Sequence, residues 1–383
     1  MKRLAYFVSH PIQYQAPLLR LLAAEPDLEL QVFFYSDFSL QGYFDPGFQR
    51  IVAWDIPLTQ GYNHHFLKTW GAKQPTGTFN QAIAQDIYDR LKSDQFDAIW
   101  VHGWSQICSL QAIVAANRLN IPVLMRGEAN GLNPPTSWKK LLKAQFFRWL
   151  CPRIDKFLYI GSLNRQFYEN LGITSDRLYA VPYAVDNDYF AKSCVVAQAN
   201  RTQFRQSLQL QPDRPIILYA AKLVEWKRPH HLLAAYQSLV PKLDIKPYLI
   251  FVGDGPMRSQ LAAQATESIR FLGFRNQSQM PAIYDLADLF VLPSSFEPWG
   301  LAINEVMNAG KAVVVSNAVG CAPDLVKDQE NGKIYRSGNL AQLEAALLWG
   351  ISNRDNAGTK SLELIKTWSF QADILGIRAS LGL

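Results

Sequence analysis

The sequence has 383 residues, of which 49% are hydrophobic and 18% charged, and its formal net charge is +6. A chain this long and this apolar is not disordered and exceeds one ordinary core, so we expect two domains. The basic balance suits an anionic ligand or a membrane surface. It is too weak for a nucleic-acid footprint, so we expect no nucleic acid as a partner. No run of about 18 apolar residues occurs, which excludes a membrane-spanning helix.

The cysteines indicate a reducing compartment. The chain has four, widely separated and without a CxxC pair: Cys108, Cys151, Cys194 and Cys321. Neither a disulfide framework nor a zinc site is expected, and buried thiols of a cytoplasmic protein fit best. The N-terminus, MKRLAYFVSHPIQ, starts with basic residues, but its apolar run is short and ends before His10. This pattern is typical of a strand rather than of a secretion signal.

Strand patterns alternate with helical patterns through the first half of the chain. Runs rich in β-branched and aromatic residues begin at Leu4, Leu28, Ala98, Pro122 and Lys156. Between them, residues 83–92 and 106–120 repeat apolar side chains at helical spacing. Strands that alternate with helices predict a parallel sheet covered on both faces. We therefore expect a Rossmann-like, doubly wound N-terminal domain over residues 1–188.

The second half repeats this alternation. Further strand runs begin at Ile216, Tyr248, Ile269, Asp288 and Ala312. Helices are expected from Pro229, from Met257 and from Leu301 to Asn308. These elements predict a second doubly wound domain over residues 212–365, and the polar stretch 189–211 is expected to link the two domains. Open α/β sheets bind ligands at the carboxyl ends of their strands, so the motifs that follow the strands are the candidates for chemistry.

Two lysines and a glycine-rich turn follow strands of the second domain. Lys222 lies in a loop, and Lys227 directly precedes a helix whose amino end projects positive potential. Each ammonium could donate a charge-assisted hydrogen bond, worth about 1.5 to 3 kcal/mol, to a diphosphate. In VGDGPM, Gly253, Asp254 and Gly255 allow a tight turn and close backbone approach. Taken alone, the lysines could also be solvated surface residues and the turn only a turn.

Two carboxylates bracket the start of a helix in SSFEPWGLAINEVM. Glu297 lies in the loop and Glu305 inside the helix, and the free N–H groups of Trp299, Gly300 and Leu301 could hold a phosphate between them. Glu305 could accept from the vicinal hydroxyls of a ribose, and Glu297 from a sugar beyond the diphosphate. A nucleoside diphosphate sugar has this order of groups. The alternative is a capping Glu297 and a buried, paired Glu305.

These motifs together resemble family-4 glycosyltransferases of the GT-B fold. Over residues 218–335, Lys222 and Lys227 match the family's basic pair, GDGP its turn, and the two glutamates its E-x7-E signature. FLGF matches the strand end that contacts the base, which places Phe274 there. The segment NAVGCAPDLVKDQENGKIY also matches. The resemblance implies two Rossmann-like domains that face each other across a cleft.

The first half is similar to the family more loosely. VPYAVDNDYF looks like the end of its first domain, and His102 looks like its strand-end histidine near the reacting sugar. Lys222 stands where arginine is common, and Arg228, where glycine is common, would add a third cation beside the phosphate. The resemblance further implies that a helix within residues 366–383 crosses back to the first domain.

What the resemblance implies is sugar transfer from a nucleoside diphosphate sugar with retention at the anomeric carbon. No bound metal and no cofactor are expected, because the two lysines would do a metal's work and no DxD pair lies in the motifs. His102 would hydrogen-bond the sugar and support its developing charge. His10, Arg126 and Glu128 are candidates for a glycan, lipid-linked or small-molecule acceptor. A nucleotide-sugar 2-epimerase of GT-B architecture, or a catalytically silent nucleotide-sugar-binding protein, would share the donor site.

A basic helical stretch raises the question of membranes. From Trp138 to Leu150, apolar residues at helical spacing alternate with lysines and an arginine. This helix could press against an anionic membrane that carries a lipid acceptor, or it could pack on its own sheet and solvate its charges. We therefore expect a cytoplasmic enzyme of polysaccharide or glycoconjugate biosynthesis that could lie at the inner face of the membrane.

Overall fold

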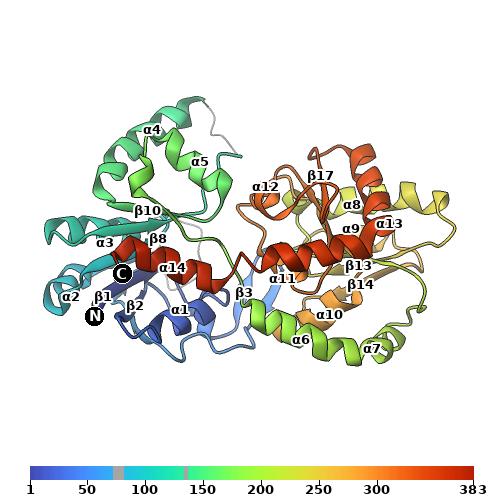
Figure 1. The fold of residues 1–383 in the computed structure, drawn as a ribbon, viewed down its shortest axis with the longest axis horizontal. Helices are drawn as coiled ribbons and strands as arrows, with labels where there is room; N and C mark the ends of the chain where they lie inside the picture. Colours follow the sequence, from blue (N-terminus) through green and yellow to red (C-terminus); the bar gives the residue numbers. More distant parts are fainter. Residues whose placement is uncertain (72–81, 133–136) are drawn as a thin grey trace. The chain divides into compact units, whose positions relative to one another are not determined.

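The computed structural model describes residues 1–71, 82–132 and 137–383, and the chain divides into two compact units (Figure 1). The first unit contains Met1–Tyr43, Ile56–Tyr183 and Phe370–Leu383. The second contains Phe44–Asp55 and Ala184–Ser369. A short N-terminal segment, residues 44–55, is thus part of the second unit, which no pattern in the sequence suggested.

A parallel sheet forms the centre of the first unit. Among the described residues its seven strands have the order β11-β10-β9-β8-β1-β2-β5. Their bounds are β1 (Lys2–Val8), β2 (Leu28–Phe34), β5 (Asn63–Phe66), β8 (Ala98–His102), β9 (Val123–Arg126), β10 (Lys156–Tyr159) and β11 (Leu178–Ala180). Strands β6 (Thr69–Trp70) and β7 (Ile83–Ala84) pair separately and antiparallel. All residues from Leu4 to Val8 are buried, as expected for a strand covered on both faces.

Helices lie on both faces of this sheet. They are α1 (Ala16–Ala23), α2 (Ile87–Asp94), α3 (Ile107–Arg118), α4 (Ser137–Leu150), α5 (Ser162–Asn170) and α14 (Phe370–Leu381). Side chains of β1 alternate in direction, so Ala5 and Phe7 pack in one core cluster with Ile113 of α3. The C-terminal helix α14 contacts β10, β11 and α1 (Figure 1). It approaches β11 so closely that a Cβ on Gly376 would lie 1.8 Å from the carbonyl oxygen of Ala180.

The second unit repeats this architecture. Among the described residues its six parallel strands have the order β14-β13-β12-β15-β16-β17. Their bounds are β12 (Ile216–Ala220), β13 (Tyr248–Val252), β14 (Ile269–Gly273), β15 (Leu289–Leu292), β16 (Ala312–Ser316) and β17 (Gly332–Tyr335). The helices are α6 (Asn187–Ala199), α7 (Arg201–Ser207), α8 (Pro229–Leu239), α9 (Arg258–Ala262), α10 (Met280–Leu286), α11 (Leu301–Met307), α12 (Ala322–Leu325) and α13 (Leu340–Ile365). Segment 44–55 adds most of the pair β3 (Tyr43–Asp45) and β4 (Arg50–Val52).

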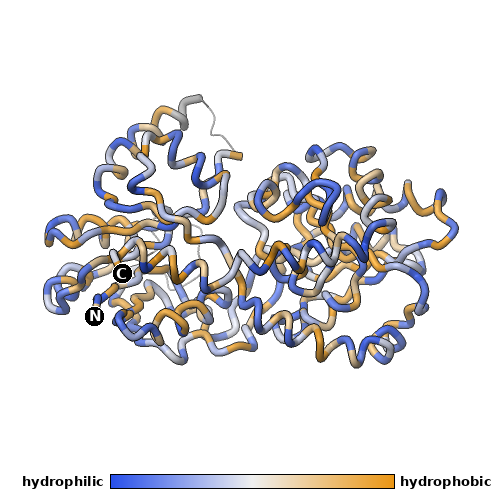
Figure 2. Tube along the Cα trace, in the orientation of Figure 1, coloured by the Kyte–Doolittle hydropathy of each residue, from blue (hydrophilic) through white to orange (hydrophobic). Residues whose placement is uncertain are grey.

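Two Rossmann-like parallel-sheet units confirm the predicted fold class. In each unit the strands are largely hydrophobic, while hydrophilic residues recur along the helices (Figure 2). The expected C-terminal helix is α14, and it belongs to the first unit. The cysteines are free thiols, and three of them are buried. Within the described part of the chain, none of the helices is both long and apolar enough to cross a membrane.

Two segments differ from the expected elements. The stretch 189–211, expected as a linker, is largely helical, and α6 packs on α10. Its polar composition reflects a narrow contact stripe, because only Phe190 and Cys194, one helical turn apart, are buried in α6. In the stretch 83–92 the helix begins at Ile87, and Ile83 lies in β7 instead.

Candidate functional site

Lys222, in the second unit, lies in the loop after β12 and pairs with a carboxylate. Its Nζ lies 2.9 Å from both carboxylate oxygens of Asp45, from segment 44–55. Asp45 is fixed by its own turn, since Gly47 N and Phe48 N donate to its Oδ1. The Lys222 side chain retains 34% exposure, against 11% for Asp45. The DPG sequence indicates a turn, but nothing local signals a partner 177 residues away.

Lys227 ends the short 3₁₀ turn Glu225–Lys227, and its ammonium forms an ion pair with Glu297. Burial, and then the neighbouring charge of Lys222, lower the pKa of Lys227 to about 8. Glu297 comes from the loop between β15 and α11, and its backbone is bridged to Val319 after β16. The structure therefore brings Lys222, Lys227 and Glu297 together at the carboxyl ends of the strands. Their charges, together with that of Asp45, sum to zero.

The glycine-rich turn supports the Lys222 loop. Gly253 and Gly255 have φ values of 124° and 150°, and a Cβ on either would lie 2.6 Å or less from a carbonyl oxygen of residue 221 or 223. Leu223 N donates to Asp254 O across the same contact. The glycines thus allow two backbones to pack together. Asp254 itself pairs with Arg258 at 3.0 Å.

The remaining residues of the E-x7-E segment are mostly buried. Glu305 lies in α11 with 4% exposure, and the Tyr284 hydroxyl donates to its Oε2. Trp299 is buried too, and its Nε1 donates to Asn304. Gly300, with φ 105°, is the residue before Leu301, where α11 begins. The structure thus places Glu305 inside the unit, where the Tyr284 hydroxyl donates to its carboxylate, and the expected contact of Glu305 with a ribose stays a prediction.

Phe274, expected near a base, lies against segment 44–55. Its ring packs edge-on to Phe48 at 5.0 Å, and the Arg50 guanidinium lies 5.1 Å from its centroid. Asn276 and Ser278, just beyond, hydrogen-bond residues 53 and 55. Segment 44–55 therefore contacts the Lys222 loop and the end of β14 together.

Arg228 has a backbone conformation that favours glycine. Its φ is 50°, in the left-handed region that disfavours a side chain. The guanidinium donates to Ser337 Oγ at 2.8 Å. This contact holds its side chain at the Ser337 turn, and the expected third cation beside a phosphate stays a prediction.

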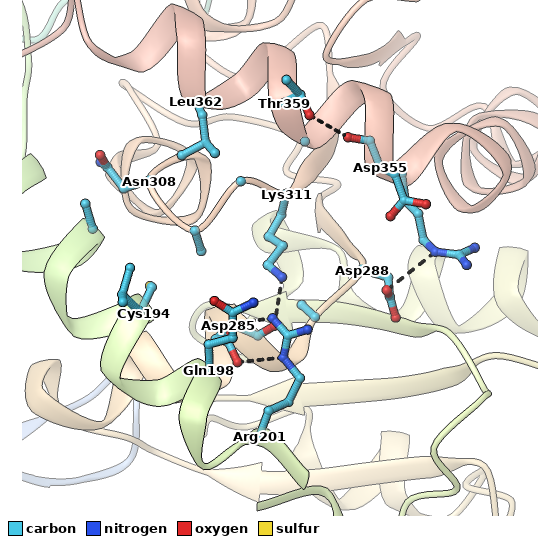
Figure 3. Close-up of a pocket in the computed structure, with 17 residues that line it drawn as sticks. Cys194, Gln198, Arg201, Asp285, Asp288, Asn308, Lys311, Asp355, Thr359 and Leu362 are labelled. Carbon is cyan, nitrogen blue, oxygen red and sulfur yellow. Dashed lines mark hydrogen bonds and ion pairs between the residues drawn. The ribbon is translucent and has the colours of Figure 1, made fainter.

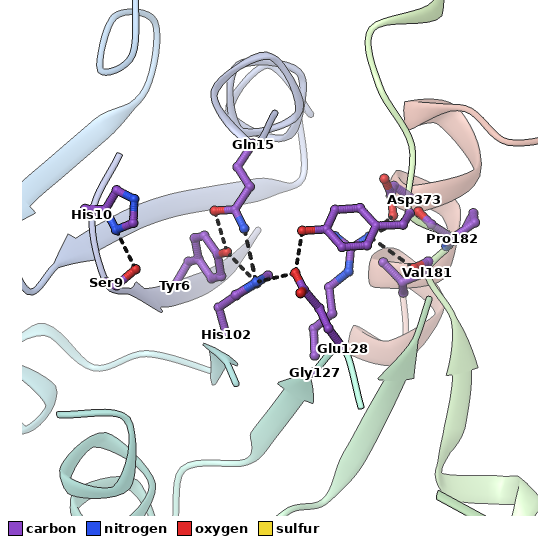
Figure 4. A network of polar contacts seen from close by, with 12 residues as sticks. Tyr6, Ser9, His10, Gln15, His102, Gly127, Glu128, Val181, Pro182 and Asp373 are labelled. Atoms are coloured by element: carbon purple, nitrogen blue, oxygen red, sulfur yellow. Dashed lines mark hydrogen bonds and ion pairs between the residues drawn. The ribbon is translucent and has the colours of Figure 1, made fainter. Parts of the chain in front are cut away.

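In the first unit, His102 ends β8 within a chain of polar contacts (Figure 4). Tyr6 Oη donates to Gln15 Oε1 at 3.0 Å, and Gln15 Nε2 lies 3.2 Å from His102 Nδ1. The Gln15 amide nitrogen can only donate, and it lies closer to Nδ1, at 3.2 Å, than to Nε2, at 3.4 Å. This favours Nδ1 as the acceptor and the ring proton on Nε2. Nε2 lies 3.8 Å from Glu128 Oε1. The proton therefore faces a carboxylate.

The three acceptor-side candidates have different surroundings. Glu128 is 39% exposed and accepts from the Tyr183 hydroxyl at 2.7 Å. Burial and the nearby His102 lower the pKa of His10 to about 4, so it is neutral near pH 7. Arg126, in contrast, is 2% exposed and donates to Asp373 and to backbone carbonyls. Its guanidinium is held inside the first unit and does not present the accessible contact that we expected for an acceptor.

A separate pocket of about 410 Å³ lies within the second unit (Figure 3). Its lining includes Asp285 and Asp288, which precede β15, and Lys311, which precedes β16. Lys311 Nζ donates to the carbonyl of Asp285, whose carboxylate pairs with Arg201. The pocket is therefore at the amino ends of these strands, whereas Glu297 follows the carboxyl end of β15.

Within the described ranges, no group of three or more His, Cys, Asp and Glu side chains is arranged to hold a metal ion. The charged groups nearest the predicted diphosphate site are the two lysines and their two carboxylate partners.

Comparison with known proteins gives a family for part of the chain. Residues 200–364 match the family described as glycosyl transferases group 1. The uncharacterized glycosyltransferase MJ1607 of Methanocaldococcus jannaschii is 23% identical over 308 residues, or 76% of this chain and 74% of that protein. O-antigen chain mannosyltransferase B of Escherichia coli is 29% identical over 206 residues, 51% of this chain and 52% of that protein.

A solved structure extends the similarity to the whole fold. The crystal structure of Anabaena HepE in complex with UDP covers 100% of both chains with a TM-score of 0.73 and 16% identity. Among curated relatives, MJ1607 is matched over most of its length, whereas four others are matched over roughly a third to a half of theirs.

Proposed function

We propose that this glycosyltransferase of the GT-B fold, whose residues 200–364 match glycosyl transferases group 1, is a retaining, metal-independent enzyme. It transfers a sugar from a nucleoside diphosphate sugar to a glycan, lipid-linked or small-molecule acceptor. The observation that carries the proposal is the convergence of Lys222, Lys227 and Glu297 on one edge of the second sheet.

The charges of this cluster fit a diphosphate ligand. Both ammonium groups are paired with carboxylates, so the cluster is neutral. A diphosphate that takes over the lysines leaves Glu297 able to accept from sugar hydroxyls, since an ionised carboxylate has about four acceptor sites. Partly buried lysines also stabilise a departing diphosphate more strongly than solvated ones, because the local dielectric constant is lower.

Retention without a metal is consistent with this arrangement. Two ammonium groups can neutralise the charge that develops on the leaving diphosphate, which is the role of a metal in other transferases. The acceptor hydroxyl then attacks on the face that the diphosphate leaves, and a diphosphate oxygen takes its proton. Bond formation to the acceptor oxygen balances cleavage of the bond to the diphosphate, and no protein nucleophile is needed.

We assign His102 to the reacting sugar. Its neighbours favour the tautomer with the proton on Nε2, which can donate to a sugar hydroxyl. Glu128, 3.8 Å from Nε2, can support positive charge on the ring. UDP-sugars should be tested first, because HepE was solved with UDP.

The test is release of nucleoside diphosphate from UDP-, GDP- and ADP-sugars, with and without acceptor extracts. Sustained release that depends on acceptor, together with an α-linked product from an α-linked donor, supports the proposal. Conversion of the sugar without acceptor indicates an epimerase, and binding without any turnover indicates a silent protein. Either of these outcomes refutes transfer.

We also propose that α4 contacts an anionic membrane surface that presents a lipid-linked acceptor. The helix packs on its own core through Phe147 and Leu150, yet Leu141 and Leu142 are 66% and 62% exposed. The side chains of residues 138–140 lie outside those described. Sedimentation with anionic vesicles should fall for Leu141→Glu and stay low with zwitterionic vesicles. Equal binding of the variant and the unchanged protein would refute this contact.

A further inference from the structure

Arg126 lies beside His102 in the sheet, and it makes more polar contacts than packing in a core requires. Strands β8 and β9 pair in parallel with His102 opposite Arg126. The Arg126 NH2 group donates to the carbonyls of Val181 and Pro182 and, at 3.1 Å, to Asp373 Oδ1. Arg126 therefore joins three separate chain segments of the first unit.

Two of these segments are where the chain leaves this unit for the second time and where it finally returns. The unit ends at Tyr183 before the chain continues into the second unit, and it resumes at Phe370. Residues 181 and 182 precede the exit, and Asp373 lies in the first turn of α14 after the return. Arg126 holds the exit and the return together through one guanidinium.

The same guanidinium connects these segments to His102. It lies 4.9 Å from the centroid of the Tyr183 ring, and the Tyr183 hydroxyl donates to Glu128 at 2.7 Å. Glu128 faces Nε2 of His102 at 3.8 Å (Figure 4). Partial burial would raise the pKa of Glu128, but His102, Tyr183 and Arg126 bring that pKa below its usual value. The carboxylate is thus ionised beside the histidine.

Burying the Arg126–Asp373 ion pair costs free energy that a purely structural role does not explain. Both side chains are at most 2% exposed. Among the described residues, Arg126 Nε and Asp373 Oδ2 are buried without a hydrogen-bond partner. Burial raises the pKa of Asp373 to about 7, although Arg126 opposes this shift. Apolar residues of similar size often stabilise a core as well as a buried ion pair does, so specific orientation of the neighbouring groups is the better explanation.

We propose that Asp373 and Arg126 are positioning residues that act through Tyr183 on the Glu128–His102 pair. The C-terminal helix α14 is then part of the machinery for sugar transfer. This inference rests on the proposed role of His102. It predicts that disturbing the chain of contacts at its far end changes turnover, with little effect on donor binding.

The test compares kcat and donor KM for Asp373→Asn, Tyr183→Phe and the double variant. We expect each single variant to lose about ten- to hundredfold in kcat, because misplaced groups cost this much. Donor KM should stay within about twofold, because the lysine cluster belongs to the second unit. The double variant should lose no more than the worse single variant, since both changes interrupt one chain of contacts.

Arg378→Ala is the matched control. Arg378 also fastens α14, but in the described part of the chain its ion pairs are with Glu25 and Asp27 rather than with the Arg126–Asp373 pair. It should lower the thermal midpoint and leave kcat unchanged. Tyr183→Phe keeps the proposal testable if Asp373→Asn fails to fold.

Several outcomes would overturn the inference. Unchanged kcat in folded Asp373→Asn and Tyr183→Phe would do so, as would losses that multiply in the double variant, or an equal loss of kcat in Arg378→Ala. His102→Ala separates this inference from the proposed function. If His102→Ala loses turnover while Asp373→Asn and Tyr183→Phe keep a normal kcat, only the positioning inference is rejected. If His102→Ala keeps normal turnover, both the role of His102 and the positioning inference are rejected.

Discussion

Replacing Asp45 by asparagine should tighten binding of a nucleoside diphosphate. The Asp45 carboxylate lies 2.9 Å from the Lys222 ammonium that we assign to the diphosphate, so both anions use one cation. Asparagine keeps an oxygen for the N–H groups of Gly47 and Phe48, which donate to Oδ1, and so preserves the turn. Only the negative charge is removed.

The magnitude follows from Coulomb's law. A phosphate oxygen on Lys222 would lie about 5 Å from the Asp45 carboxylate, and repulsion there is about 1 to 3 kcal/mol for effective dielectric constants of about 80 to 20. The lower half of this range applies, because a third of the Lys222 side chain is exposed. We expect about 1.4 kcal/mol, a tenfold lower Kd for UDP.

The assay is isothermal titration with UDP at two salt concentrations. The gain should shrink at high salt, since ions screen a partly exposed charge. Asp55→Asn is the control, because Asp55 lies on the same segment but accepts from Ser278. Weaker UDP binding in Asp45→Asn would refute the reasoning and show that Asp45 positions Lys222. An equal gain in UDP affinity in Asp55→Asn would show that the gain comes from the net charge of the protein and not from the position of Asp45.

Further predictions concern Lys227, Glu305, Arg228 and metal dependence. Lys227→Ala or Glu305→Ala should lower kcat/KM by about 2 to 4 kcal/mol, a factor of about 30 to 1000, in a steady-state assay, with an unchanged circular dichroism spectrum; unchanged kinetics in both would contradict the site. Because the pKa of Lys227 is lowered to about 8, its charged form is lost as pH rises through 8, so kcat/KM should fall there, and Lys227→Arg should abolish this fall. Arg228→Gly should be more stable than Arg228→Ala by about 1 kcal/mol in chemical unfolding, because alanine keeps the left-handed strain; equal stability would contradict this. Activity should survive EDTA, and loss that Mg²⁺ restores would reject metal independence.

The fold was predictable because each sheet is covered on both faces. Buried parallel strands appear as continuous apolar runs, as at Leu4 to Val8 or Tyr248 to Val252, and such runs are visible without any partner. Short strands gave no such signal. β5, with the sequence NHHF, joins the first sheet although its exposed edge position leaves it polar.

The proximity of the two lysines to Glu297 was predictable, because their motifs follow parallel strands. Lys222, Lys227 and Glu297 meet because parallel strands end on the same edge. The contribution of Asp45 could not be foreseen, because its partner is 177 residues away and a turn sequence specifies only local geometry. The burial of Arg126 could not be predicted from the sequence either, because the carboxylate that balances its charge, Asp373, comes from the last helix.

The placement of residues 44–55 bears on how this chain can be divided. A gene fragment that begins at residue 184 would lack Asp45 beside Lys222 and Phe48 beside Phe274. A fragment that stops at residue 183 would carry those twelve residues without the surface on which they fold, and would also lack the helix that supplies Asp373. Separately expressed halves are therefore poor surrogates for the undivided chain, and ligand titrations should use residues 1–383 together.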